Sequence, residues 1–192
     1  MNLNTRTPIQ YSPIGRAVKK FLHTKVGAFI GFTLGLQGFN QIQAIVTRSN
    51  GKVEILRSYN SRTDVGAALT STLMSGTTLG SLTSPAAPKY LAVSSSTLTP
   101  AHTDTTLTGE LSTNGFTRAA ATAGGYTAPA SLDAGASFTQ SHTFTATGTQ
   151  TVASAALFDA ATGGNLFVEG NLATSASLNS GDTLQVVWTV NN

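Results

Sequence analysis

Residues 183–190 alternate between apolar and polar side chains, and this period of two restricts the possible folds of the chain more than any other stretch. Successive side chains of a β-strand point to opposite faces, so the pattern predicts a half-buried strand. Only Val187 interrupts the polar face. The apolar face holds Leu184, Val186, Trp188 and Val190. We expect this strand to close a β-sandwich, and nothing in it has the character of a catalytic site.

Two further stretches predict hairpins. Apolar runs around 155–158 and 166–168 flank a turn with Gly163 and Gly164, and residues 42–59 contain Asn50-Gly51 between two apolar runs. Glycine adopts φ > 0 without steric cost, and Asn-Gly favours a type I′ turn. Residues 138–147 alternate as well, with threonines along one face, which is typical of a solvated or partner-facing sheet surface.

Several short strands separated by turns predict a mainly β protein, an antiparallel β-sandwich or jelly roll. A charged fraction of only 10% and an abundance of Thr, Ser, Ala and Gly suit such a fold. Without cysteines the fold is held by sheet packing or by burial against partners. The residues expected in the core are Phe138, Phe144, Leu157, Phe167, Leu184, Val186 and Trp188.

One helix is predicted, over residues 64–76. Thr63 or Asp64 supplies the N-cap and Gly76 the end, while Val65, Leu69 and Leu73 recur at helical spacing. Gly66 weakens the helix. Residues 77–88 form a Ser/Thr/Gly/Pro connector, residues 97–111 a long loop, and residues 115–122 a further strand.

The apolar run 26–37 admits two interpretations. Glycines at 27, 31 and 35 have the small-xxx-small spacing of membrane helices. The run is shorter than the ~20 residues that a spanning helix needs, and the preceding segment does not fit a signal peptide. With a period of two, apolar residues line one face and glycines the other. We therefore expect a strand, which joins the 42–59 hairpin in a small antiparallel sheet of its own.

Charge is distributed unevenly along the chain. Residues 1–53 carry seven basic residues and no acid, whereas the remainder carries four basic residues and all eight acids. The basic front is expected to dock on an acidic surface. Residues 1–25 are predicted to form an extended arm whose partner-binding residues are Arg6, Arg16, Lys19, Lys20 and Lys25. Aromatic residues are sparse there and no recognition motif follows, so a protein surface is favoured over nucleic acid.

These features divide the chain into four parts. Residues 1–25 form the arm, 26–60 the hairpin and small sheet, 61–88 the short helix and linker, and 89–192 the β-sandwich domain.

The segment 64–122 and the C-terminal stretch carry a family resemblance. The run Asp104-Thr-Thr-Leu-Thr-Gly-Glu110, the strand-like Gly115–Thr122 and the end "AALFDAATGGNLFVEGNL…NSGDTLQVVWTV" occur in an order that resembles small structural proteins of tailed bacteriophages, of the tail-fibre-like or virion type. The resemblance covers about two thirds of the chain and leaves residues 1–60 unmatched. It implies a non-enzymatic β-sandwich that assembles on the virion, on the capsid or on the tail.

Candidate chemical sites are few. His23, His102 and His142 are far apart and lack partners at ligand spacing, and no nucleophile elbow is present, so neither zinc nor acyl transfer is expected. Asp104 and Glu110 offer oxygens that calcium accepts, but their spacing is not that of an EF-hand. We expect Asp104 to cap a turn and Glu110 to pair with a basic neighbour. No catalytic residue, cofactor or metal is expected.

Three functions remain open at this point. The first is a capsid decoration protein that docks through its basic arm and stabilises the shell by binding only its assembled form. The second is a tail accessory protein of a fibre, collar or baseplate. The third is a carbohydrate- or host-surface-binding module that uses the threonine face. The expected partners are other virion proteins and further copies of the chain, with no membrane and no nucleic acid.

Overall fold

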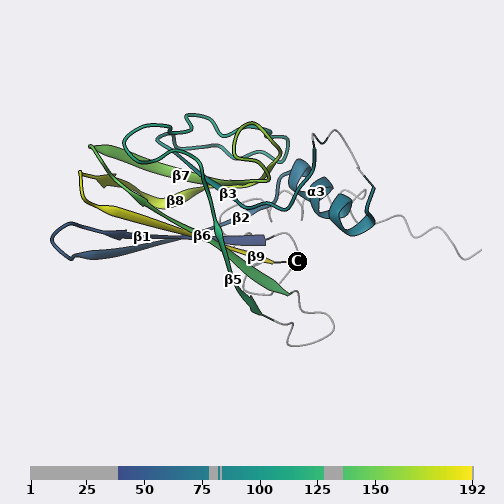
Figure 1. The fold of residues 1–192 in the computed structure, drawn as a ribbon, viewed down its shortest axis with the longest axis horizontal. Coiled ribbons are helices and arrows are strands. Elements are labelled where there is room, and N and C mark those ends of the chain that lie inside the picture. Colours follow the sequence, from purple (N-terminus) through teal and green to yellow (C-terminus); the bar gives the residue numbers. More distant parts are fainter. Residues whose placement is uncertain (1–38, 78–81, 83, 128–135, 192) are drawn as a thin grey trace, which may run out of the picture.

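The computed structural model describes residues 39–77, 82, 84–127 and 136–191, so the predicted arm, the predicted strand at 26–36 and His23 lie outside the described residues. The described chain forms two antiparallel sheets and one helix (Figure 1). The elements are β1 (Phe39–Thr47), β2 (Val53–Ser61), α3 (Asp64–Ser75), β3 (Tyr90–Ser94), β4 (Ala119–Ala120), β5 (Thr122–Thr127), β6 (Ser137–Thr145), β7 (Gln150–Phe158), β8 (Leu166–Leu178) and β9 (Thr183–Asn191).

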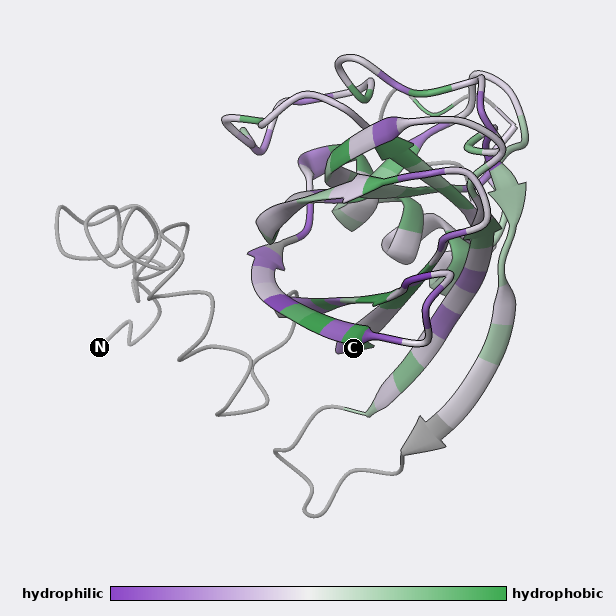
Figure 2. Cartoon of the chain, turned by 90° about the vertical axis from the view of Figure 1, so that its left-hand side faces the viewer, coloured by the Kyte–Doolittle hydropathy of each residue, from purple (hydrophilic) through white to green (hydrophobic). Residues whose placement is uncertain are grey.

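The two sheets face each other across one apolar core, which confirms the predicted mainly β, sandwich-type fold. The strand order is β2-β1-β9-β6-β5 in the five-stranded sheet and β4-β3-β7-β8 in the four-stranded sheet. Hydrophobic and hydrophilic residues follow one another along the strands (Figure 2). In β9 the alternation is complete, with the even-numbered residues from Leu184 to Val190 buried. The jelly-roll assignment and the division into four parts stay predictions.

The β1–β2 hairpin is not part of a separate small sheet, and that prediction was wrong. β1 pairs with β9 over Asn40–Val190 to Thr47–Thr183, so the hairpin extends the main sheet of the sandwich. The hairpin loop is attached to the turn before β9 by the buried carboxylate of Asp182. Its oxygens accept hydrogen bonds from the backbone N–H groups of Asn179 and Ser49, at 3.0 and 2.8 Å, and Arg48 lies 3.2 Å away. These backbone hydrogen bonds, assisted by Arg48, lower the pKa of Asp182.

The turn of this hairpin also differs from the prediction. A type I′ turn needs positive φ at both central residues, but of Asn50 and Gly51 only Gly51 has one, at 83°. The Gly51 N–H donates to the Arg48 carbonyl and the Arg48 N–H to the Lys52 carbonyl, both at 2.8 Å. This is a three-residue loop with glycine in the left-handed position, another common hairpin connection.

Helix α3 begins and ends where the capping residues predict. The Thr63 hydroxyl accepts from the Gly66 N–H at 2.9 Å, and Gly76 ends the helix with φ of 69°. The buried face differs from the prediction, because it holds Gly66, Leu69 and Thr72, whereas Leu73 is 48% exposed. A Cβ on Gly66 would lie 1.9 Å from the carbonyl oxygen of Phe167, so the missing side chain is what lets the helix lie directly on β8.

A long connection from residue 95 to residue 118 covers the outer face of the four-stranded sheet. It encloses a second, small apolar cluster that contains Ala92, Leu107, Ala156, Phe158 and Leu166. The loop predicted over 97–111 is thus confirmed. The single strand predicted over 115–122 was wrong: residues 119–120 form β4 in one sheet and β5 begins at residue 122 in the other. The chain crosses between the sheets at this point.

Candidate functional site

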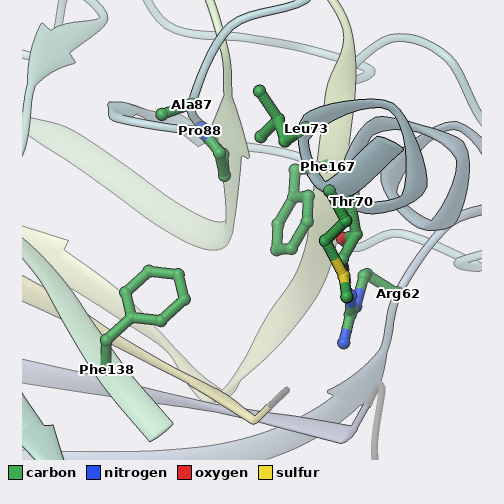
Figure 3. Close-up of a pocket in the computed structure, with 8 residues that line it drawn as sticks. Arg62, Thr70, Leu73, Ala87, Pro88, Phe138 and Phe167 are labelled. Carbon is green, nitrogen blue, oxygen red and sulfur yellow. Dashed lines mark hydrogen bonds between the residues drawn. The ribbon is translucent and has the colours of Figure 1, made fainter. Parts of the chain in front are cut away.

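A groove of about 560 Å³ lies among the described residues at the end of the sandwich next to helix α3. Figure 3 shows Phe138 on one side, the helix residues Thr70 and Leu73 on the other, and Phe167 between them. The groove is lined by Arg62, Thr70, Leu73, Met74, Ala87, Pro88, Phe138 and Phe167. Met74 is 84% exposed at its rim. The volume is within the range of small-ligand sites, and the walls are mainly apolar.

A bulge in β8 places Phe167 in the groove. The pairing of β7 with β8 shifts register between Leu157 and Phe158, which leaves Phe167 between two paired residues. Its carbonyl then accepts from the Thr63 N–H at 3.3 Å and the Thr63 hydroxyl at 3.1 Å. The bulge therefore both fixes the start of helix α3 and points the Phe167 side chain at the groove.

Arg62 is the one charged residue among the eight that line the groove. Its guanidinium donates to the Thr70 hydroxyl at 2.7 Å and to the Asn191 carbonyl at 2.8 Å, and lies 5.2 Å from the centroid of the Phe167 ring. Burial lowers the pKa of the Arg62 guanidinium. Because its terminal nitrogens already donate to the protein, Arg62 ties the helix to β9, and the groove offers apolar contact rather than acid–base chemistry.

A second polar site lies under the loop that covers the four-stranded sheet. Glu169 of β8 is 3% exposed, and its carboxyl contacts that of Asp104 on the loop. Burial, followed by the hydrogen bond to Asp104 and its charge, raises the pKa of Glu169 to about 8. Glu169 is therefore protonated at neutral pH and donates to the Asp104 carboxylate. Asp104 also accepts from the Ala101 N–H at 2.6 Å, which confirms the predicted turn cap.

Glu110 pairs with a basic neighbour, as predicted. Arg118 donates to both of its carboxylate oxygens, at 2.8 and 2.6 Å, and its guanidinium lies 3.6 Å from the centroid of the Phe158 ring. A third nitrogen donates to the carbonyls of Ala160 and Gly163. All three nitrogens of the guanidinium thus donate within the protein, and Arg118 fastens the covering loop to the β7–β8 hairpin.

The remaining titratable candidates are separate from each other. His102 lies 2.6 Å from the Asp64 carboxylate on the surface, and His142 lies 3.0 Å from the Ala120 carbonyl and edge-on to Phe144. Asp104 and Glu110 do not converge. Over the part of the chain that the structure describes, no three His, Asp or Glu side chains group in a way that holds a metal ion.

The structure buries six of the seven residues expected in the core, and it places Phe138, which is half-buried, at the groove. The two most unusual polar residues, Arg62 and Glu169, were missed by sequence reasoning. The run 166–170 is apolar except for the carboxyl of Glu169, and this pattern indicates a buried acid. The sequence does not show that its partner is Asp104, which is far away along the chain. Arg62 carries no comparable signal.

Two antiparallel sheets, a closed apolar core and an apolar surface groove define a β-sandwich structural module. The sequence model of a family described as "Podophage GP4 fiber I protein gp80" matches residues 66–189, nearly two thirds of the chain. The chain therefore belongs to this family of phage fibre proteins. A search of curated proteins found no match.

This membership confirms the resemblance to tailed-phage structural proteins and the location in the virion. The matched range begins in helix α3 and ends in β9, so it includes the four-stranded sheet, the Arg118–Glu110 ion pair and the residues that line the groove except Arg62. None of the helices in the described residues has the length and hydrophobicity needed to cross a membrane.

Proposed function

We propose that the protein is a non-enzymatic accessory component of a phage fibre, attached to the virion and acting through assembly rather than through chemistry. The match of residues 66–189 to a podophage fibre family carries this proposal. Two ion pairs support this proposal, because the charges of Arg118–Glu110 and Asp182–Arg48 are paired within the protein and hold loops to the sandwich. The groove adds an apolar surface with Arg62 as its one charge.

The family favours the tail-fibre alternative over the capsid decoration that the basic front first suggested. Decoration rested on the idea that a basic arm clamps onto a shell, and the arm lies in residues 1–25, outside the matched range. A fibre component needs the same kind of attachment to a neighbouring virion protein. In this proposal Arg6, Arg16, Lys19, Lys20 and Lys25 supply that attachment, and the sandwich supplies the body of the fibre part.

The proposal is tested on purified particles. Quantitative mass spectrometry gives the copy number relative to the major capsid protein, and gold-labelled antibodies raised against residues 39–191 show where the protein lies. A low copy number with label at the tail is the expected result. A copy number close to that of the capsid protein, with label over the shell, would mean decoration. Absence from particles would refute both.

A matched pair of variants tests the attachment. Replacement of the five basic residues of 1–25 by glutamine should leave the sandwich folded and prevent incorporation into particles. Replacement of the exposed body residues Lys52 and Lys89 by glutamine changes charge without touching the arm and should leave incorporation intact. Equal incorporation of both variants would remove the arm from the mechanism.

A further inference from the structure

Strand β2 is an edge of the five-stranded sheet, and within the described residues it pairs with β1 alone. The Arg48 N–H donates to the Lys52 carbonyl, which fixes the alternation of the ladder. Residues 54, 56 and 58 then point their backbone groups at β1, and Val53, Ile55 and Arg57 point theirs outward. The edge holds no proline, and it is nine residues long. Such an edge is a template for pairing with another chain.

Two of the side chains that β2 places on the outer face of the sheet are apolar and exposed. Val53 is 54% exposed and Ile55 is 51% exposed. Ile55 lies directly opposite Ile45 of β1, and Ile45 lies opposite Gln185 of β9. Val53, Ile55 and Ile45 therefore form a short apolar strip at the edge of the sheet, which ends at Gln185.

The whole outer face around this strip is almost free of charge. The alternate residues of β2, β1, β9 and β6 that share the face are Val53, Ile55, Arg57, Tyr59, Gln41, Gln43, Ile45, Thr47, Thr183, Gln185, Val187, Thr189, Thr139, Ser141, Thr143 and Thr145. Arg57 is the single charge among them, and none of the acids of the protein is present. Glu54, on the opposite side of β2, lies 3.6 Å from Arg48.

We propose that the β2 edge binds a second copy of this chain, so that two five-stranded sheets join through antiparallel β2 strands related by a two-fold axis at Ile55. In this register Ile55 meets Ile55 of the other copy, and Val53 meets Arg57. The outward N–H and C=O groups of all three residues then pair across the axis. The aliphatic stem of Arg57 covers Val53, and both exposed apolar residues leave water.

The charge distribution favours a copy of the same chain over a charged partner. Arg57 is the one charge among the outer-face residues of β2, β1, β9 and β6, so two copies that meet through this face bring no carboxylates into opposition. A strongly acidic or basic partner would gain only the contact with Arg57. The inference rests on the proposed function of a protein that acts through assembly, but it is tested on the isolated protein.

The absence of cysteine gives a direct test. In the proposed register the two Ile55 Cα atoms are about 5.5 Å apart, a separation that a disulfide bridges. We expect Ile55→Cys to form a covalent dimer under mild oxidation, whereas Ser71→Cys, at an exposed position on helix α3 that does not line the groove, does not. Equal cross-linking of both variants, or none of Ile55→Cys, would overturn the register.

Sedimentation velocity on the full chain measures the association itself. We expect the wild type to dimerise with rising concentration, and Ile55→Lys to raise the dimer dissociation constant by at least about tenfold, because two like charges then meet on the axis. Ser71→Lys should leave it unchanged. Ile55→Pro removes the outward N–H and keeps the β1 ladder, so it should also weaken the dimer. A monomeric wild type at every concentration, or a dimer unaffected by Ile55→Lys, would overturn the proposal without bearing on the location in the virion.

Discussion

The carboxyl pair under the covering loop makes the stability of this protein depend on pH in a direction that can be worked out. Glu169 has an ordinary pKa of 4.5 and a pKa of about 8 in the folded protein. The folded state therefore holds this proton more tightly than the unfolded state does. The stabilisation is fully present below pH 4.5 and is lost as the pH rises towards 8.

The size follows from the two values. Each pH unit between them lowers the free energy of unfolding by about 1.4 kcal/mol, and the whole interval therefore accounts for at most about 5 kcal/mol. Most of this comes from the burial of Glu169, with a smaller part from Asp104. Since small domains unfold at a cost of about 5–15 kcal/mol, the effect is measurable.

The variant that isolates the effect is Glu169→Gln. Glutamine keeps the shape and donates to Asp104 but does not ionise, so the variant should approach the wild type in stability near pH 5 and exceed it by several kcal/mol above pH 8. Asp104→Asn removes the neighbouring charge and leaves the burial, so the upper end of the pH interval should move down. The difference between wild type and variant cancels the titration of other groups.

Urea unfolding between pH 5 and pH 9 provides the assay, with the fluorescence of Trp188 as the signal. Trp188 is the single tryptophan of the chain and is fully buried. Circular dichroism at each pH checks that both proteins start folded. Parallel stability curves for the wild type and Glu169→Gln across this range would refute the assignment of a protonated Glu169.

Two further predictions concern loop and helix contacts. Gly66→Ala should destabilise the protein by more than about 3 kcal/mol, because the added Cβ collides with the Phe167 carbonyl, although alanine favours a helix by about 1 kcal/mol. Ser71→Ala, on the exposed side of the helix, is the control. Equal thermal unfolding midpoints for the two variants would contradict the prediction. Arg118→Lys keeps the charge but loses the bidentate hydrogen bonding to Glu110, so urea unfolding should show that the free energy of unfolding falls by about 2 kcal/mol. An unchanged urea midpoint would show that the guanidinium geometry does not matter.

Local features of this fold could be predicted from the sequence. The strand at β9, the β1–β2 and β7–β8 hairpins and both caps of helix α3 depend on residues within a few positions of one another, such as Thr63 with Gly66. Such patterns act over short distances, so a single sequence displays them.

Features that join distant segments could not be predicted. Periodicity does not say that β1 lies beside β9, which placed the hairpin in the wrong sheet. The sequence alone predicts that Gly66 weakens the helix, because nothing local shows the approach of the Phe167 carbonyl. The raised pKa of Glu169 depends on a loop residue 65 positions away, Asp104, and on burial by a loop whose path the sequence does not give.

The central position of β9 has a consequence for the order in which the protein folds. β9 lies between β1 and β6, so the five-stranded sheet cannot form until residues 183–191 have been synthesised. The β7–β8 hairpin needs only neighbouring segments and can form earlier. Loop closure between residues 40 and 190 is slow, since distant pairings lose chain entropy before they gain contacts. Until β9 has been synthesised, the apolar face of β1 stays open to other chains, so contact between unfinished chains competes with folding at this stage.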